Sequence, residues 1–304
     1  MKSETIQILK KVLGNNVIEL FYRSLGFLSD ERYLRLMFRL RMGKKLSLDN
    51  PKTFCEKLQW LKLYDHNPLY TTLVDKIEVK KYVESVIGPD HIIKTIRCWE
   101  SFDEIDFDVL PEQFVLKCNH DSGGLCIVRD KSLFNVKEAK KTIDRSLRRS
   151  FYKNYREWAY KGISPKVFAE EYLDAGEEGL TDYKFFCFNG EPKFINVSRF
   201  EHTDDEEISF YSLDWKETPF QRVDHKRLSI VPSRPHCLDE MIEISRKLSN
   251  GIPFVRVDLY ENNDKVYFGE MTLCPSAGFA KYGPENWNET LGDWIKLPSV
   301  RANQ

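Results

Sequence analysis

The chain has 304 residues, of which 41% are hydrophobic and 13% aromatic, and its formal net charge is −1. This composition is ample for a packed core and argues against long disorder, and the nearly neutral charge gives no overall attraction to nucleic acid. The seven cysteines are scattered without a Cys-x-x-Cys pair, so neither a disulfide framework nor a zinc knuckle is expected.

The N-terminus shows no apolar segment after its first charges, and no apolar run approaches the roughly 18 residues that a membrane span needs. We therefore expect a cytoplasmic protein. Residues 1–62 hold 13 Lys and Arg against 6 Asp and Glu. This basic start suits peripheral contact with the inner face of a membrane or with a polyanion, and a solvated helix face is the alternative.

The first third of the chain is predicted to be helical. Apolar residues recur at helical spacing in residues 6–13 and 33–40. Thr53 is followed by Glu56 and Asp75 by Glu78, the spacing of a capping box, so a helix is expected to begin at each place. Gly88 and the proline after it end the second of these helices.

From Pro111 onward the pattern changes to short apolar runs. Two strands are predicted at 114–116 and 125–128, joined as a hairpin by a polar loop. A helix at 137–149 and a strand at 166–172 follow.

The last part of the chain contains two more predicted hairpins, at 182–197 around Asn189-Gly190 and at 254–271, with an amphipathic helix at 238–248 between them. Residues 199–236 are polar and irregular, and we expect a mobile lid or a substrate loop there.

The first candidate site is the segment Lys117–Gly124, which reads Lys-Cys-Asn-His-Asp-Ser-Gly-Gly. A lysine at the end of a buried strand can reach a phosphate, and the amides of serine and glycine can bind phosphate oxygens. The segment is not a Walker A motif, so the usual P-loop fold is not predicted. A plain hairpin turn is the alternative interpretation.

The second candidate site lies on the final hairpin. Alternation places Arg256 and Asp258 on one face of a strand, and Glu270 and Thr272 can meet them from the partner strand. Two carboxylates and a hydroxyl suit Mg²⁺, and an arginine beside them can stabilise a transferring phosphoryl group. An ion pair on the surface of a sheet is the alternative, but the apolar neighbours indicate buried strands, and buried carboxylates without a cation are costly.

Several longer phrases resemble the TupA-like ATP-grasp family, which is associated with bacterial surface polysaccharides, including teichuronopeptide synthesis. The resemblance extends from about Tyr33 to Pro298. The phrases are Asn-Pro-Lys-Thr-Phe from Asn50, Glu-Lys-Leu-Gln-Trp from Glu56, Phe-Val-Leu-Lys-Cys-Asn-His-Asp-Ser-Gly from Phe114, Asp-Tyr-Lys-Phe-Phe-Cys-Phe-Asn-Gly from Asp182 and Phe-Val-Arg-Val-Asp-Leu-Tyr from Phe254.

The resemblance implies an α+β class and the ATP-grasp fold, in which two lobes with antiparallel sheets hold ATP between them. On this basis the expected divisions are an N-terminal helical segment at 1–50, a helical region at 51–112, a small lobe at 113–174 and a large lobe at 175–304.

The resemblance also implies roles for individual residues. Lys76 and Lys117 are expected to bind ATP phosphates, and the loop of His120, Asp121, Ser122, Gly123 and Gly124 to close over them. Glu170, Glu171, Tyr172 and Leu173 are expected to form a hinge that binds adenine. Asp182 is the expected ribose-binding carboxylate. One or two Mg²⁺ ions are expected at Asp258, Glu270 and Thr272, the last standing where many ATP-grasp enzymes have asparagine. Arg256 is the expected catalytic residue, and Pro275–Gly278 is an expected binding segment for the carboxylate substrate.

The implied reaction is phosphorylation of a carboxylate by ATP followed by attack of an amine, with a uronic acid and an amino acid or amine as expected substrates in capsule or surface polysaccharide synthesis. Three alternatives stay open: a kinase without ligation, a glycosyltransferase using Asp106-Phe107-Asp108, and a non-catalytic scaffold. No nucleic-acid motif accompanies these features, so no nucleic-acid partner is expected.

Overall fold

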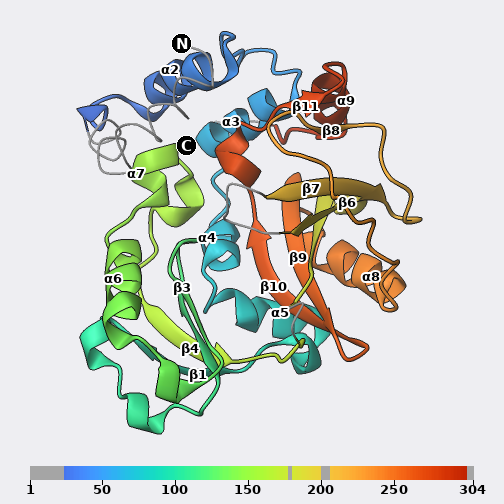
Figure 1. Ribbon diagram of the computed structural model, residues 1–304. Coiled ribbons are helices and arrows are strands. Elements are labelled where there is room, and N and C mark those ends of the chain that lie inside the picture. Colours follow the sequence, from blue (N-terminus) through green and yellow to red (C-terminus); the bar gives the residue numbers. More distant parts are fainter. Residues whose placement is uncertain (1–23, 177–179, 200–205, 300–304) are drawn as a thin grey trace.

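A computed structural model describes residues 24–176, 180–199 and 206–299 (Figure 1). The helix expected at residues 6–13 lies outside these ranges. The described chain forms two larger antiparallel sheets with helices packed against them, which confirms the α+β class. No helix in the described ranges combines the length and the apolar character that crossing a membrane requires.

The smaller of the two sheets has four strands in the order β1-β4-β2-β3. The strands are β1 (Thr95–Trp99), β4 (Val167–Glu171), β2 (Phe114–Cys118) and β3 (Leu125–Val128). Helix α6 (Val136–Leu147) covers one face, where Ala139 and Ile143 pack with Leu116 and Val128. The predicted hairpin β2–β3 is confirmed, with Lys117 paired to Leu125 at its end.

The larger sheet has five strands in the order β10-β9-β5-β6-β7. The strands are β10 (Lys265–Thr272), β9 (Phe254–Asn262), β5 (Asp182–Phe188), β6 (Glu191–Arg199) and β7 (Glu207–Ser212). Both predicted hairpins, β5–β6 and β9–β10, are confirmed.

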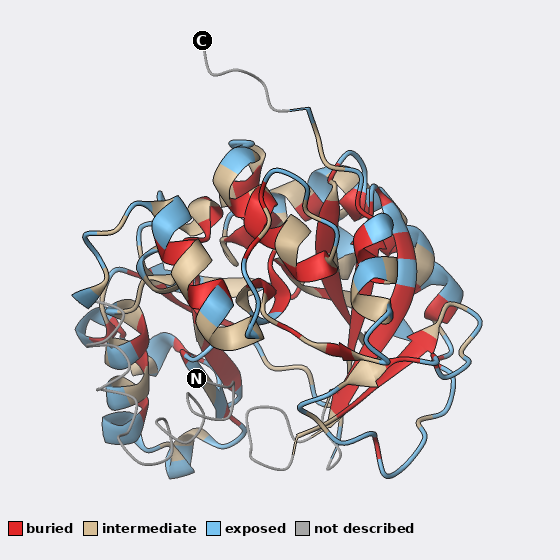
Figure 2. Ribbon diagram, turned by 90° about the horizontal axis from the view of Figure 1, so that it is seen from above, coloured by how far each residue is buried: buried red, intermediate tan, exposed pale blue. Residues whose placement is uncertain are grey.

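Because successive side chains of a strand point to opposite faces, the larger sheet has two different faces. One face is apolar throughout, with residues such as Phe185 and Val257. Three helices cover it: α4 (Leu69–Val74), α5 (Val79–Ile87) and α8 (Leu238–Ser249). Figure 2 shows the buried residues concentrated along the strands and on the inner sides of the helices.

The opposite face changes character along each strand. Strand β9 presents Phe254 and then Arg256 and Asp258, and β5 presents Asp182, Lys184 and then aromatic residues. Three helices pack only on the aromatic end: α2 (Asp30–Met42), α3 (Phe54–Tyr64) and α9 (Trp287–Asp293). The charged end of the face is left uncovered for a site.

Helix α3 begins as the sequence predicts. The Thr53 hydroxyl accepts a hydrogen bond from the Glu56 amide at 3.3 Å, and Glu56 accepts one from the Thr53 amide at 3.0 Å. These bonds satisfy amide groups that the helix itself leaves unpaired. The cap fixes where α3 begins, next to α9.

Two expectations about secondary structure are wrong. The region before Pro111 is not wholly helical, because β1 forms the edge of the smaller sheet beside β4. Residues 199–236 are not wholly irregular. They contain β7 and the short β8 (Gln221–Arg222), which pairs with β11 (Tyr282–Gly283). Residues 200–205 of this region lie outside the described ranges.

Replacing Gly292 by alanine is expected to destabilise the fold by about 3 kcal/mol, the upper end for overpacking. Gly292 lies on α9 against the start of α3, and a Cβ there would lie 1.9 Å from the Lys52 carbonyl oxygen. Urea unfolding checks this, with Gly162→Ala as control because its Cβ meets only Thr71 at 3.9 Å. Equal stability of the two variants would contradict the proposed close contact between α3 and α9.

Candidate active site

Two adjoining cavities lie where the charged end of the larger sheet meets the smaller sheet. The first, about 610 Å³, contains the charged residues of β5, β9 and β10. The second, about 770 Å³, reaches the end of β4. Five residues line both cavities: Lys117, Leu125, Asp182, Ser198 and Tyr260. The two cavities therefore form one continuous site between the sheets.

The pairing of β9 with β10 brings the predicted metal-binding residues together. Asp258 lies opposite Glu270, and Arg256 lies opposite Thr272. Arg256 binds both Asp258 oxygens, at 2.7 and 2.5 Å, and one Glu270 oxygen at 3.0 Å. Thr272 donates to the same Glu270 oxygen at 3.1 Å. The convergence expected from strand alternation is confirmed.

Arg256, Asp258 and Glu270 form a charged floor of the first cavity, and two lysines complete it. Lys76 Nζ lies 2.9 Å from the second Glu270 oxygen. Lys184, which the sequence reasoning did not single out, donates to Asp182 at 2.7 Å and to Ser198 at 3.3 Å. Three carboxylates are thus matched by three cations.

Burial and charge act against each other on these carboxyl groups. Burial raises the pKa of Asp258, the guanidinium of Arg256 opposes that rise, and the Asp182 and Glu270 carboxylates add to it. For Glu270 burial also favours the neutral acid, but Lys76 and Arg256 hold its pKa well below the ordinary value. The cations therefore keep Glu270 ionised, whereas at Asp258 burial and the neighbouring carboxylates outweigh Arg256 and the pKa is raised to about 7.

This oxygen-rich set fits a hard cation. Asp258 and Glu270 present four carboxylate oxygens next to the Thr272 hydroxyl, the donor chemistry that Mg²⁺ prefers. In the structure the same oxygens bind Arg256 and Lys76. A metal ion would take over neutralisation of the carboxylates and leave Arg256 and Lys76 to bind phosphate oxygens.

The end of the smaller sheet holds a second buried charge cluster. Glu170 is ion-paired with Lys117 through one oxygen and with Lys80 at 3.0 Å through the other. Lys80, another residue that the sequence reasoning missed, also donates to the Ile93 carbonyl and the Thr95 hydroxyl, both at 2.7 Å. Glu170 therefore positions the predicted phosphate-binding Lys117 while also lining the second cavity.

The second cavity has a largely apolar wall beside the chain segment that follows β4. Its lining includes Glu171, Tyr172 and Leu173, which belong to the predicted hinge. Leu125 and Ile127 of β3, which are 40% and 55% exposed, line it from the smaller sheet. An apolar slot of this kind suits a planar heterocycle such as adenine.

The predicted phosphate loop contributes only in part. Asp121, Ser122 and Gly124 line the first cavity, whereas His120 is buried behind it and Gly123 does not line it. Gly124 has a packing reason to be glycine, because a Cβ would lie 2.4 Å from the Ser146 hydroxyl. Asp121 accepts a hydrogen bond from Ser146 at 2.7 Å, which holds the loop against α6.

Helix α3 holds the segment Pro275–Gly278 at the other end of the first cavity. Gln59 donates to the Gly278 carbonyl at 2.8 Å, and Lys62 donates to the Ala277 carbonyl at 2.7 Å. Gly278 adopts φ of +70°, and a Cβ there would lie 2.5 Å from Gln59. The phrase Glu-Lys-Leu-Gln-Trp, quoted above for the resemblance, thus includes a residue that supports the site.

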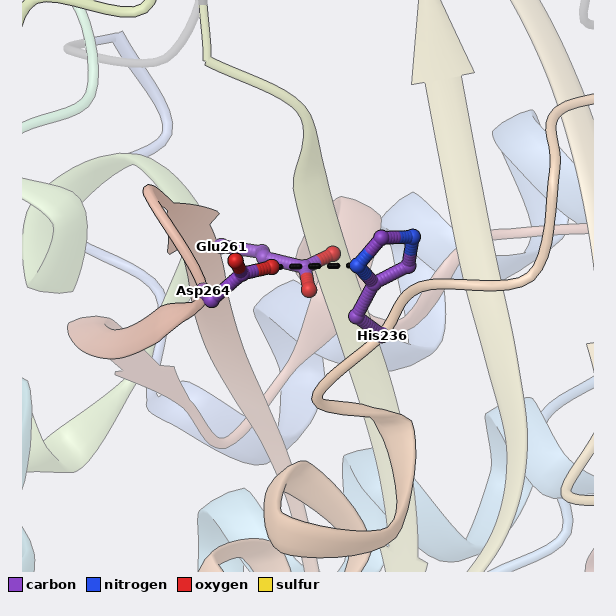
Figure 3. Close-up of side chains that lie close together, drawn as sticks. All are labelled: His236, Glu261 and Asp264. Carbon is purple, nitrogen blue, oxygen red and sulfur yellow. Dashed lines mark hydrogen bonds and ion pairs between the residues drawn. The ribbon is translucent and has the colours of Figure 1, made fainter.

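Two other candidate clusters lie elsewhere. Asp106 and Asp108 sit in an exposed 3-10 turn, not at a strand end, and Asp106 accepts the Asp108 amide at 3.0 Å. His236, Glu261 and Asp264 come together at the surface (Figure 3), where the His236 and Asp264 side chains are 83% and 80% exposed and 3.0 Å apart.

The residues that sequence reasoning missed have only weak signals. Lys80 lies on the first turn of α5, four residues after Lys76. Lys184 follows Asp182 by two residues on β5, so these two share a face of the strand. Gln59 and Lys62 are indistinguishable in sequence from residues on a solvated helix face. Their roles depend on a loop more than 200 residues away.

Replacing Glu170 by glutamine is expected to destabilise the protein by about 3 kcal/mol at neutral pH, because two partly buried ammonium groups lose their counter-charge. Lys117 and Lys80 hold the pKa of Glu170 below the ordinary 4.5 despite its burial. The ionised pair therefore stabilises the protein above about pH 4.5, and this contribution is lost as the pH falls toward the lower folded pKa.

Urea unfolding at pH 7 and pH 4 measures this effect. The difference between wild type and Glu170→Gln should be smaller at pH 4. Glu171→Gln is the matched control, because the Glu171 side chain is 53% exposed and lies 3.9 Å from Lys94. A Glu170→Gln variant as stable as the control at pH 7 would refute the proposed charge cluster.

Comparison with solved structures shows a distant likeness to several ligases. D-alanine–D-alanine ligase from Bacillus anthracis matches at 18% identity and a TM-score of 0.39, over 66% of this chain and 57% of the ligase. The D-alanine–D-alanine ligase from Helicobacter pylori matches at 14% identity and a TM-score of 0.44, over 82% of this chain and 69% of the ligase. D-cycloserine synthetase DcsG matches at 16% identity and a TM-score of 0.42, over 75% of this chain and 70% of the synthetase.

The chain thus spans little more than half the length of the first of these proteins. No curated protein sequence matches it significantly. A family model described as TupA-like ATPgrasp matches residues 56–296, which include the charged floor, the predicted hinge and all but the first two residues of α3. The chain belongs to the TupA-like ATP-grasp family, as the resemblance of its phrases predicted.

Proposed function

We propose that this protein is an ATP- and Mg²⁺-dependent ligase that joins a carboxylate to an amine through an acyl phosphate. One observation carries the proposal. Arg256, Asp258, Glu270 and Lys76 lie together in one cavity. This cavity continues past Lys117 into an apolar slot. Membership of an ATP-grasp family supports the same chemistry.

In this proposal the nucleotide spans both cavities. The segment Glu171–Leu173 and the apolar wall of the second cavity bind adenine, and Asp182, which lines both cavities, binds the ribose. Lys117 and Lys76 bind phosphate oxygens. Asp258, Glu270 and Thr272 hold Mg²⁺, which neutralises charge on the phosphates when bound.

The two chemical steps need alignment and charge neutralisation more than a protein nucleophile. A carboxylate oxygen of the first substrate attacks the γ-phosphorus of ATP, and ADP leaves with the bridging oxygen. The amine nitrogen of the second substrate then attacks the acyl carbon. Inorganic phosphate leaves and the nitrogen loses a proton, so an amide, ADP and phosphate are the products. Arg256 stabilises the charge that develops on the transferred group.

For the substrates we propose a sugar carboxylate such as a uronic acid and an amino acid or other amine, in the synthesis of a bacterial surface polysaccharide. The setting of the family motivates this choice. The basic start of the chain further motivates a proposed peripheral contact with the inner face of a membrane, which co-sedimentation with anionic and neutral vesicles would test.

The Asp258→Asn variant is expected to lose ATP-dependent product formation by about two orders of magnitude or more, because it removes a charge that neutralises the metal. The measurement is a mass-spectrometric screen with Mg-ATP, pooled sugar carboxylates and pooled amines. A new mass equal to acid plus amine minus water, together with ADP, would identify both substrates.

The matched control for this screen is Asp264→Asn, an exposed carboxylate on the turn of the same hairpin. ADP release without an adduct would replace the ligase proposal by a kinase. Equal activity of Asp258→Asn and the control would remove Asp258 from the site. No ATP turnover with any pool would contradict action on free small-molecule acids.

A further inference from the structure

Arg41, at the end of α2, reaches the active-site cavity from outside the region matched by the family model. Its guanidinium lies over the Phe279 ring, 4.8 Å from the centroid, and 5.6 Å from the centroid of Tyr155. These two aromatic rings help to hold the guanidinium in place through cation–π attraction. Arg41 lines the first cavity and not the second, so it lies away from the proposed adenine slot.

Arg222 also lines the first cavity, and it contacts Ser276, three residues before the Phe279 ring that Arg41 covers. It forms a two-point ion pair with Asp224, at 2.8 and 2.6 Å, and its remaining terminal nitrogen donates to the Ser276 hydroxyl at 2.8 Å. The carboxylate behind Arg222 fixes the plane of the guanidinium, and Ser276 lies in front of it. This arrangement presents a guanidinium and a hydroxyl to the cavity in a fixed geometry.

The segment carrying Ser276 is held in an unusual backbone conformation. Ser276 and Ala277 adopt φ of 51° and 53°, the left-handed region that residues other than glycine rarely occupy. Lys62 and Gln59 of α3 bind the carbonyl groups of this segment, as described above. Strained backbone that is fixed by buried side chains is typical of binding sites formed before the ligand arrives.

The charges at this end of the cavity favour an anion. The cations are Arg41, Arg222 and His225. Hydrogen bonds to Asp224 and Glu206 raise the pKa of His225 to about 9, so it is protonated at neutral pH. Asp224 and Glu206 oppose them. Glu157 also lines the cavity, and burial raises its pKa to about 7. Lys62 lies behind the segment Pro275–Gly278, where burial lowers its pKa. Among the described residues, Arg41, Arg222 and protonated His225 thus face the carboxylates of Asp224 and Glu206 and the partly protonated Glu157.

We propose that Arg41 and Arg222, together with Ser276, form an oxyanion subsite for a second negatively charged group of the substrate. The group is a carboxylate or a phosphate, distinct from the carboxylate that becomes phosphorylated beside Arg256. The N-terminal helix α2 thereby selects the substrate. The inference rests on the proposed function, because that function places the nucleotide at the opposite end of the site.

The test is isothermal titration of the full-length protein with inorganic phosphate and, separately, with glucuronate, each with and without saturating Mg²⁺ and a non-hydrolysable ATP analogue. With the nucleotide site filled, the wild type should bind one of these anions saturably. Arg41→Gln and Arg222→Gln should each weaken that binding about tenfold or more, as expected for loss of a charge-assisted hydrogen bond. Affinity for the ATP analogue should not change in Arg41→Gln.

The matched control is Arg39→Gln, an exposed arginine on the same turn of α2 that does not line the cavity. Arg41→Lys should restore part of the binding, which a purely structural role for Arg41 would not produce. Tighter binding of phosphate would identify a phosphorylated or nucleotide-linked sugar, and tighter binding of glucuronate a carboxylate.

The subsite is overturned if neither anion binds the wild-type complex, or if Arg41→Gln and Arg39→Gln bind equally. A protein that fails to bind the ATP analogue but shows anion binding dependent on Arg41 would overturn the proposed ligase function and leave the anion subsite in place. The two failures are therefore distinguishable.

Discussion

Desolvation of Asp258 and Glu270 is the constraint on which the rest of the site depends. Two carboxylates that face each other across β9 and β10, at the bottom of a cavity, repel each other and lose hydration. Arg256 and Lys76 offset both costs through short ion pairs. These cations come from different parts of the chain, so the electrostatics of the floor hold the segment before α5 against the final hairpin.

The same cations suit the proposed reaction because they can change partners. A divalent cation bound to the carboxylates would release Arg256 and Lys76 toward phosphate oxygens without leaving any buried charge unpaired. Lys117 is held in the same way by Glu170, which Lys80 also neutralises. The site therefore has ammonium and guanidinium groups on both sides of the cleft whose present partners are carboxylates of the protein itself.

The sequence predicted the parts of this arrangement that follow from local periodicity. Alternation along a strand placed Arg256 and Asp258 on one face, Asn189-Gly190 located a hairpin, and the capping box at Thr53 located the start of α3. It could not reveal Lys80 or Gln59, because each binds a group far away in the chain. Lys184 binds Asp182 two residues away, but an alternating lysine on a strand is equally typical of a solvated sheet face. Strand β7 was missed because its alternating residues lie within a stretch that is polar on average.

The N-terminal helices are best understood through the mixed face of the larger sheet. Strands β5 and β9 each carry aromatic residues at one end and charges at the other, and both groups point the same way. Helices α2 and α3 must cover the aromatic end to bury it, so their edges necessarily border the charged end. Residues at that border, Arg41 on α2 and Gln59 and Lys62 on α3, then lie at the cavity or behind its wall. Packing of the aromatic end therefore brings a segment that precedes the region matched by the family model to the edge of the proposed active site.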